Sequence, residues 1–222
     1  MINQNENADE KMRILGISGS GRKRSYNTAL LDAAEELAPE GVIVEIFDIS
    51  NLPLYNSDLE RSIPAQVREF KKRIRDADAI LFAAPEHNYT ITAVMKNAIE
   101  WGNRPPNDNS WDNKPAAIIS ASSSPRGGVR AQLHLRQIMI DLNMHPINRP
   151  LLLVANEEEK FDSNMKLTDP QIRETLHSLL VRLEEWTRKL QLESRKLPPE
   201  YLNKFLVECT RVMTEPLKNE AF

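Results

Sequence analysis

The sequence has little cysteine and little glycine, and each scarcity narrows what the chain can do. Cys209 is the only cysteine, so no internal disulfide can form, and the absence of clustered histidines around it leaves a structural zinc ion without obvious ligands. We expect no metal site. Only seven glycines occur in 222 residues, yet five of them gather in two places: Gly16, Gly19 and Gly21 in the first, and Gly127 and Gly128 in the second. These places call for unusual backbone conformations, so we look there for function.

The chain also lacks a basic excess and a long apolar run. Its 29 Lys and Arg residues against 32 Asp and Glu residues give a formal net charge of −3, which disfavours nucleic acid as a partner because phosphate neutralisation needs cations. No apolar run approaches the ~20 residues of a membrane-spanning helix, and the first eleven residues lack the basic start and apolar middle of a signal peptide. We therefore expect a cytoplasmic protein with no membrane partner.

Hydrophobic residues make up 41% of the chain, enough to fill the core of one large domain. We expect a disordered tail over residues 1–11, a folded domain over residues 12–190 and a helical extension over residues 191–222. A helix of the extension's length is marginal in water unless its apolar side is buried, so we expect it to pack across a subunit interface. The apolar side chains that the extension carries include Tyr201, Phe205, Val212 and Met213.

Five short apolar runs alternate with segments of helical periodicity, and the runs predict buried strands. Strict alternation of strands and helices indicates a doubly wound α/β domain, in which helices cover both faces of a parallel sheet. Five strands favour the flavodoxin-like order 2-1-3-4-5 over a six-stranded dinucleotide-binding fold, although sequence alone does not fix strand order. The expected strands span residues 13–18, 42–47, 79–84, 116–120 and 147–154, and the last helix runs from about Asp169 to Leu190.

The loop after the first strand, residues 18–27, has the composition of a phosphate site. Its glycines allow tight turning, its hydroxyl and amide groups can donate to anionic oxygens, and Arg22, Lys23 and Arg24 favour negative charge. The N-terminus of the following helix adds the positive end of its dipole. The plain alternative is an ordinary connection in which Asn27 caps the helix and the basic residues face solvent.

This loop departs from the two common nucleotide-binding motifs. A P-loop requires Lys and then Ser or Thr after its second glycine, and Arg22 and Lys23 stand there instead, which disfavours an NTPase. A dinucleotide motif requires a third glycine where this chain has Arg24, although Asp48 could serve as its ribose carboxylate, so this alternative is weakened but stays open. The Ser, Arg and Asn content better suits the terminal phosphate of a mononucleotide such as FMN.

Three other connections reach the same edge of the expected sheet, over residues 48–63, 85–90 and 121–128. His87 is the only histidine in these candidate loops, and we expect its ring to pack rather than to deliver a proton. The acidic run Glu157–Glu159 follows the fifth strand; we interpret it as a solvated loop that could border the mouth of the pocket.

Two further features are assigned no role in binding. The basic run from Lys71 to Arg75 is expected to form the solvated face of a helix. Trp101 and Trp111 bracket a short loop with little apparent core role, and we expect either a lid or subunit contact, or a simple connector.

Four motifs together resemble the NADPH-dependent FMN reductases, a flavodoxin-like family that includes quinone, chromate and azo reductases. They occur in the family's order and spacing over residues 12–190. The motifs are Gly19-Ser20-Gly21-Arg22 followed by Ser25 and Asn27, Leu52-Pro53-Leu54-Tyr55-Asn56, Pro85-Glu86-His87-Asn88 through Lys96-Asn97-Ala98-Ile99-Glu100-Trp101, and Gly127-Gly128-Val129-Arg130-Ala131-Gln132.

The resemblance implies a non-covalently bound FMN and hydride transfer from NADH or NADPH, through flavin N5, to a small-molecule acceptor such as a quinone. It also implies a homodimer or homotetramer. The flavin carries the chemistry, so no catalytic side chain is expected. Carried over by position, the phosphate contacts fall on Ser18, Ser20, Arg22, Ser25 and Asn27, the contacts along the isoalloxazine on Pro85, Glu86, His87 and Asn88, and the contacts from the fourth strand on Ser122, Ser123 and Ser124.

The chain departs from the family pattern at three points: His87 replaces the usual Tyr, Ala93 a frequent Pro, and Ser124-Pro125 a usual glycine. The rival interpretation is a flavodoxin-like electron carrier that holds FMN for a protein partner and has no NAD(P)H activity of its own. Oxidation of NAD(P)H by the isolated protein distinguishes the two.

Overall fold

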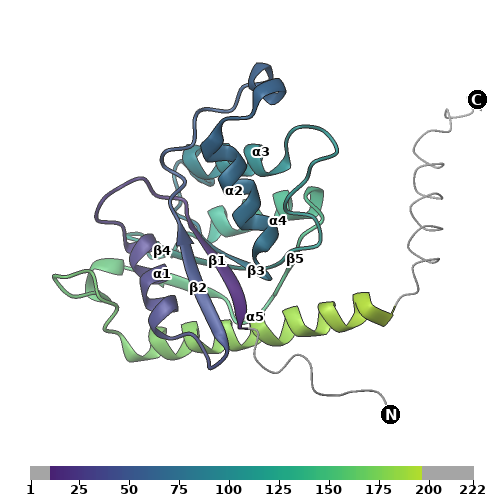
Figure 1. The fold of residues 1–222 in the computed structure, drawn as a ribbon. Helices are drawn as coiled ribbons and strands as arrows, with labels where there is room; N and C mark the ends of the chain where they lie inside the picture. The colour runs from purple at the N-terminus through teal and green to yellow at the C-terminus, as the bar shows by residue number, and fades with distance from the viewer. Residues whose placement is uncertain (1–10, 197–222) are drawn as a thin grey trace, which may run out of the picture. The chain divides into compact units, whose positions relative to one another are not determined.

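A computed structural model of the chain describes residues 11–196, and the chain divides into two units after Thr187. The expected tail, apart from Lys11, lies outside the described residues, as do Tyr201, Phe205, Val212 and Met213 of the expected C-terminal extension. The described elements, in chain order, are β1 (Met12–Ser18), α1 (Tyr26–Glu36), β2 (Val42–Phe47), the 3-10 helix η1 (Ser57–Ser62), α2 (Ala65–Asp76), β3 (Ala79–Ala83), α3 (Ala93–Asn103), β4 (Pro115–Ser122), α4 (Val129–Asp141), β5 (His145–Pro146), β6 (Leu152–Ala155), the 3-10 helix η2 (Glu157–Glu159) and α5 (Pro170–Lys196) (Figure 1).

The strands form one parallel sheet in the order β2-β1-β3-β4-β5, which confirms the predicted flavodoxin-like arrangement. The first strand lies inside the sheet, where Ile14 pairs with Val44 of β2 on one side and with Ala79 of β3 on the other. Parallel neighbours align their carboxyl ends, so the loops after β1, β3 and β4 meet at one edge of the sheet.

The fifth strand differs from its prediction. Instead of one strand over residues 147–154, the chain forms two short strands, β5 and β6, and both pair with β4. Pro150 lies between them and has no backbone N–H to donate to a sheet ladder, so the pairing stops and resumes at Leu152. Burial is interrupted at the same place, because Ile147, Leu152 and Val154 are buried whereas Asn148, Arg149 and Leu151 are exposed.

The helices bury the two faces of the sheet in two separate cores (Figure 1). Successive residues on β1 point to opposite faces, so Ile14 joins the core beneath α1 and α5, whereas Leu15 joins the core beneath α2, α3 and α4. The predicted last helix is present as α5, and its residues Leu176, Leu179 and Leu183 are all buried. Within residues 11–196, no helix combines the length and apolar character that a membrane crossing needs.

Trp101 and Trp111 are core residues, which corrects the expectation that they have little core role. Each is fully buried. The indole N–H of Trp101 donates to the carbonyl oxygen of Pro53 at 2.7 Å, and that of Trp111 donates to the carbonyl oxygen of Ile99 at 3.1 Å. Gly102 is required here, since a Cβ on it would overlap the Trp111 ring. The two aromatic rings therefore fix the C-terminal end of α3.

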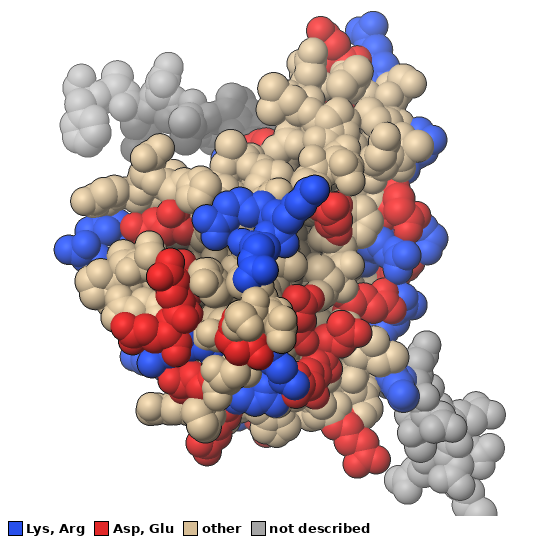
Figure 2. All heavy atoms as spheres, turned by 90° about the vertical axis from the view of Figure 1, so that its left-hand side faces the viewer, with Lys and Arg blue, Asp and Glu red and all other residues tan. Residues whose placement is uncertain are grey.

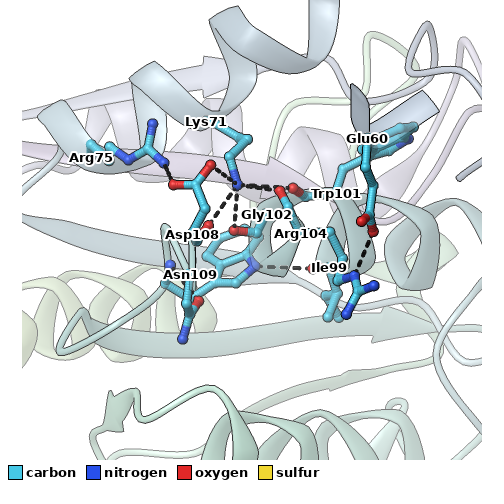
Figure 3. Close-up of polar contacts among 10 residues, drawn as sticks. Glu60, Lys71, Arg75, Ile99, Trp101, Gly102, Arg104, Asp108 and Asn109 are labelled. Atoms are coloured by element: carbon cyan, nitrogen blue, oxygen red, sulfur yellow. Dashed lines mark hydrogen bonds and ion pairs between the residues drawn. The ribbon is translucent and has the colours of Figure 1, made fainter. Parts of the chain in front are cut away.

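Lys71 is buried rather than solvated, and only 2% of its side chain is exposed. Its ammonium group reaches four backbone carbonyl oxygens, those of Trp101, Gly102, Arg104 and Asp108, at 2.6–3.3 Å (Figure 3). Burial lowers the pKa of Lys71, while the nearby Asp108 carboxylate opposes that shift. The Lys71 side chain thus joins α2 to the end of α3 and to the loop that follows α3.

Candidate functional site

The loops that follow β1, β3, β4 and β6 surround one hollow of about 140 Å³ at the carboxyl edge of the sheet. Nine of the twelve predicted site residues line it, together with Ala121 and Glu157, which were not predicted as binding residues. The nine are Ser20, Arg22, Ser25, Asn27, Pro85, Glu86, His87, Ser122 and Ser123. Ser18, Asn88 and Ser124 lie outside this lining. Residues separated by a hundred positions in the sequence therefore share one cavity.

Hydroxyl groups shape the loop between β1 and α1. The Oγ atoms of Ser18 and Thr28 lie 2.8 Å apart, and Ser18 also accepts from the backbone N–H of Ser20. These bonds hold the Ser18 side chain against Thr28 and Ser20, and Ser18 does not line the hollow. Ser25, not Asn27, caps α1, because its Oγ accepts the N–H of Thr28. The Ser25 hydroxyl hydrogen remains available for an anionic oxygen.

Asn27 joins α1 to β4 beneath the hollow. Its side chain is 5% exposed and makes two bonds with Ala121: Nδ2 donates to the carbonyl oxygen at 2.9 Å, and Oδ1 accepts the N–H at 3.0 Å. A primary amide has two N–H groups, so one donor is left for a ligand. Asn27 is thus both a structural tie and a candidate phosphate contact.

The loop after β3 makes a tight turn at the rim. His87 and Thr90 exchange two backbone hydrogen bonds, and the two residues between them, Asn88 and Tyr89, both have positive φ values, 48° and 70°. His87, Asn88 and Tyr89 are exposed, so their rings and amide lie where an aromatic ligand could contact them from outside the sheet.

Glu86 ties this loop to the start of α4. Its carboxylate accepts the backbone N–H of Arg130 at 3.0 Å and pairs with the Arg130 guanidinium at 3.3 Å. The guanidinium also lies 3.9 Å from the centre of the Tyr89 ring. Arg130 therefore connects the loops after β3 and β4.

The loop after β4 is folded around its own serines. Ser122 and Ser124 are 3.2 Å apart at their hydroxyls, and Ser124 also accepts from the N–H of Arg126. Ser122 and Ser123 reach the hollow, whereas Ser124 faces its own loop. Gly127 and Gly128, with φ values of 57° and 83°, then turn the chain into α4.

The connection over residues 48–63 contributes no side chain to the hollow and is held against α3 instead. Asn97 accepts the N–H of Tyr55 at 2.7 Å and donates to the carbonyl oxygen of Pro53 at 3.0 Å. Arg104 donates to the Glu60 carboxylate at 2.7 Å (Figure 3). The Tyr55 hydroxyl and Arg104 hold the pKa of Glu60 below its usual range. The second and third family motifs are therefore one packing unit.

Two groups of opposite charge line the same hollow. Arg22 and Glu157 both line it, and only 9% of Glu157 is exposed. Burial raises the pKa of Glu157, and the Arg22 guanidinium opposes this rise. Glu157 was not predicted to line the site because it belongs to an acidic run, Glu157–Glu159, which is typical of a solvated loop. Its position directly after a strand was the sequence feature that could have indicated its place.

Basic side chains gather locally rather than over a whole face. Figure 2 views the molecule from the side of α1 and shows a compact group of Lys and Arg side chains with Asp and Glu side chains around it. Arg24 is turned away from the hollow, since its guanidinium donates to the carbonyl oxygen of Ser163 at 2.8 Å. Among residues 11–196, no three His, Cys, Asp or Glu side chains come together as a metal site.

The donors around the hollow fit the phosphate end of FMN. Arg22 supplies a fixed positive charge, and Ser20, Ser25 and Asn27 supply neutral donors at the start of α1. A hollow of about 140 Å³ is smaller than the roughly 300 Å³ that a whole drug-sized ligand fills, so it suits a phosphate group with the remainder of the ligand over the rim.

Comparisons with known proteins match nearly all of the sheet-bearing part of the chain. The family model of NADPH-dependent FMN reductases matches residues 12–159. An NAD(P)H-dependent FMN reductase from Pseudomonas aeruginosa is 44% identical over 183 residues, which cover 82% of this chain and 98% of that protein. An NADPH:quinone oxidoreductase from Arabidopsis thaliana is 44% identical over 187 residues, 81% of this chain and 94% of that protein.

A solved structure agrees with these matches. The flavoenzyme NAD(P)H:(acceptor) oxidoreductase FerB from Paracoccus denitrificans superimposes with a TM-score of 0.75 at 30% identity, covering 80% of this chain and 98% of that one. Sequence and fold lead to the same conclusion: the chain belongs to the NADPH-dependent FMN reductase family.

Proposed function

We propose that the protein reduces quinones or similar small acceptors with NADH or NADPH, using FMN whose phosphate is bound in the hollow at the start of α1. Its family membership makes it an NAD(P)H-dependent oxidoreductase with FMN as cofactor. The observation that carries the proposed placement is that nine predicted residues from three connections line one cavity.

Bound FMN would supply the hydride-transfer chemistry between nicotinamide and acceptor, so the protein has to bind and orient rather than donate protons. Arg22, Ser20, Ser25 and the free N–H of Asn27 hold the phosphate. Ser122, Ser123 and the rim formed by Pro85 to Asn88 border the isoalloxazine. The matched NADPH:quinone oxidoreductase supports a quinone as acceptor.

Arg22→Ala tests the phosphate position. Loss of a charge-assisted contact should cost about 1.5–3 kcal/mol, which is roughly a ten- to hundredfold weaker affinity for FMN. Riboflavin has no phosphate, so its affinity should hardly change. Arg24→Ala is the matched control, because it removes the same charge from the same loop while Arg24 is bonded to Ser163 outside the hollow. Equal losses for FMN and riboflavin would reject the placement.

The electron-carrier alternative makes a different prediction for the isolated protein. We expect NAD(P)H oxidation that depends on added quinone, measured as the loss of absorbance of the reduced nicotinamide. FMN-loaded protein that binds its flavin tightly yet leaves both NADH and NADPH unoxidised would support the carrier.

We further propose a homo-oligomer that associates through α3 and α4. A groove of about 480 Å³ lies between these helices. On α4, Leu133 and Ile140 are 59% and 80% exposed, an apolar pair that a second copy would cover. Light scattering of wild type and of Ile140→Glu tests this, since the charge should shift the assembly toward the monomer. A cytoplasmic location stays a prediction.

A further inference from the structure

Glu157 occupies an unusual place for an acidic residue, inside a cavity built for an anion. It directly follows Asn156, whose φ of 50° turns the chain away from β6, and it lines the hollow with Arg22 and Ser122. Only 9% of the residue is exposed, whereas its neighbours Glu158 and Glu159 are exposed. The backbone therefore directs one of three consecutive glutamates to the hollow.

The buried carboxyl group is incompletely bonded. Its Oε2 atom is shielded from solvent and has no hydrogen-bond partner among the described residues. Such an oxygen is costly to leave unpaired when it is ionised, because neither water nor a donor compensates the charge. Burial accordingly raises the pKa of Glu157, against the opposing effects of its own backbone N–H and of Arg22.

Among the described residues that line the hollow, Arg22 is the one cation available to Glu157. Glu158 adds to the rise in the pKa of Glu157, and Arg22 opposes it. Glu86 also lines the hollow but is paired with Arg130. His87 stands at the rim and is exposed. A phosphate monoester carries about −1.5 to −2 charges at pH 7, so a bound phosphate and an ionised Glu157 would share one guanidinium.

We propose that Glu157 is a specificity-determining residue that distinguishes FMN from riboflavin. It couples binding of the FMN phosphate to uptake of one proton from solvent. In the protonated form, the Glu157 O–H can donate to a phosphate oxygen, and Arg22 is left to neutralise the phosphate alone. In the ionised form, Glu157 repels the phosphate and competes for Arg22. This inference rests on the proposed placement of the phosphate in the hollow.

The sign of the pH dependence follows from this coupling. Well below the pKa of Glu157 in the flavin-free protein, the group is protonated before and after binding, and its contribution does not change with pH. Above that pKa, each bound FMN takes up a proton, so the affinity for FMN falls as pH rises, until the group is ionised in the complex as well. Each unit by which the phosphate raises this pKa corresponds to about a tenfold change in affinity.

The test compares wild type with Glu157→Gln, which keeps the shape and removes the ionisation. FMN dissociation constants are measured by flavin fluorescence between pH 5 and pH 8.5, a range that begins just above the ordinary pKa of Glu. The ratio of the two constants cancels the titration of free FMN. We expect equal affinities at the acid end and about tenfold tighter binding by the variant at the alkaline end.

Two controls isolate the group and the phosphate. Glu159→Gln removes the same charge from an exposed neighbour that does not contribute to the rise in the pKa of Glu157, and its FMN affinity should follow wild type at every pH. Riboflavin should bind wild type and Glu157→Gln equally. Calorimetry of wild type in two buffers of different ionisation enthalpy should detect proton uptake with FMN that is reduced in Glu157→Gln, a readout that does not depend on enzyme activity.

Three results would overturn the proposal: parallel pH profiles for wild type and Glu157→Gln, weaker FMN binding by the variant, or the same effect on riboflavin as on FMN. The Arg22→Ala result separates this failure from a failure of the phosphate placement. If Arg22→Ala weakens FMN binding selectively and Glu157→Gln leaves the pH profile unchanged, only the role of Glu157 is wrong. If Arg22→Ala has no selective effect, both proposals are wrong.

Discussion

The ammonium nitrogen of Lys71 lies 2.6 Å from the carbonyl oxygen of Arg104, and the same nitrogen donates to three further carbonyl oxygens at the end of α3 and in the following loop. The last carbonyls of a helix have no partner within the helix and carry its negative dipole end. A buried lysine on α2 satisfies them here (Figure 3). The side chain of Arg104 then reaches Glu60, so the same anchor supports the connection after β2.

Lys71→Met should therefore be strongly destabilising. The substitution keeps the apolar stem but leaves the carbonyl oxygens of Arg104 and Asp108 without this donor, and we expect a loss of about 3–5 kcal/mol in the free energy of unfolding. Lys72→Met is the matched control, since Lys72 is exposed and pairs with Asp76 on the surface, and it should cost less than about 0.5 kcal/mol. Urea denaturation measures both. Equal costs would mean that Lys71 packs through its stem alone.

Lys71 also shows what the sequence contained and what it concealed. It follows Val67 by four residues and precedes Ile74 by three, so helical spacing places it on the buried face of α2 beside Phe70. We nevertheless predicted that Lys71 is exposed to solvent, because charged side chains are rarely buried. The carbonyl oxygens that make its burial possible come from residues 101–108, and no local pattern could reveal them.

The strand order and the loops of the site were predictable because both follow from alternation. Apolar runs separated by helical segments require a parallel sheet, and a parallel sheet gathers its loops at one edge. The interruption between β5 and β6 around Pro150 and the inward orientation of Glu157 could not be predicted in this way, because each depends on the conformation of a single connection. Nine of the twelve predicted contact residues line one hollow, whereas Ser18, Asn88 and Ser124 do not. That these residues bind FMN stays a prediction.

Asn27→Ala should reduce stability and FMN affinity together. The substitution leaves the N–H and the carbonyl oxygen of Ala121 unpaired in a buried place, which should cost about 2–3 kcal/mol in the flavin-free protein. The exposed Asn51, which bonds only to Asp48 nearby, provides the control, and Asn51→Ala should stay within about 0.5 kcal/mol of wild type. Arg22→Ala should weaken FMN binding without the loss of stability. A stable Asn27→Ala protein would contradict the structural role of Asn27.

Asp169 should make the stability of α5 depend on pH. Its Oδ1 accepts the N–H groups of Gln171 and Ile172 at 3.0 and 3.1 Å, and its Oδ2 lies 3.1 Å from Lys160 Nζ. The Ile172 N–H and Lys160 lower the pKa of Asp169 below its ordinary value of 3.8. The stabilisation by the charge is therefore complete above about pH 5 and is lost as pH falls through the lowered pKa of the native state.

The measurement is urea unfolding of wild type, Asp169→Ala and Asp169→Asn at several pH values. At pH 7, Asp169→Ala should lose about 1 kcal/mol as a helix cap is removed, and Asp169→Asn should lose less because an amide oxygen can still accept. The difference between wild type and Asp169→Asn should shrink below about pH 4. A difference that stays constant down to pH 2.5 would show that the charge of Asp169 contributes nothing.

Gly127 and Gly41 provide a matched pair for separating backbone strain from crowding. Both have positive φ, 57° and 81°, so alanine at either position is strained by roughly 1–2 kcal/mol. A Cβ on Gly41 would have open space around it, whereas a Cβ on Gly127 would lie 2.8 Å from the backbone carbon of Leu153. Gly127→Ala must therefore also push α4 and β6 apart.

We expect Gly41→Ala to lower the free energy of unfolding by about 1 kcal/mol with FMN affinity unchanged, and Gly127→Ala to lower it by at least about 2 kcal/mol more. Because β6 leads directly into Glu157 and the hollow, Gly127→Ala should weaken FMN binding as well. Denaturant unfolding and flavin fluorescence on the same preparations measure both effects. If the two alanine variants lose equal stability and bind FMN equally, β6 tolerates displacement, and the close approach of Gly127 to Leu153 does not position the site.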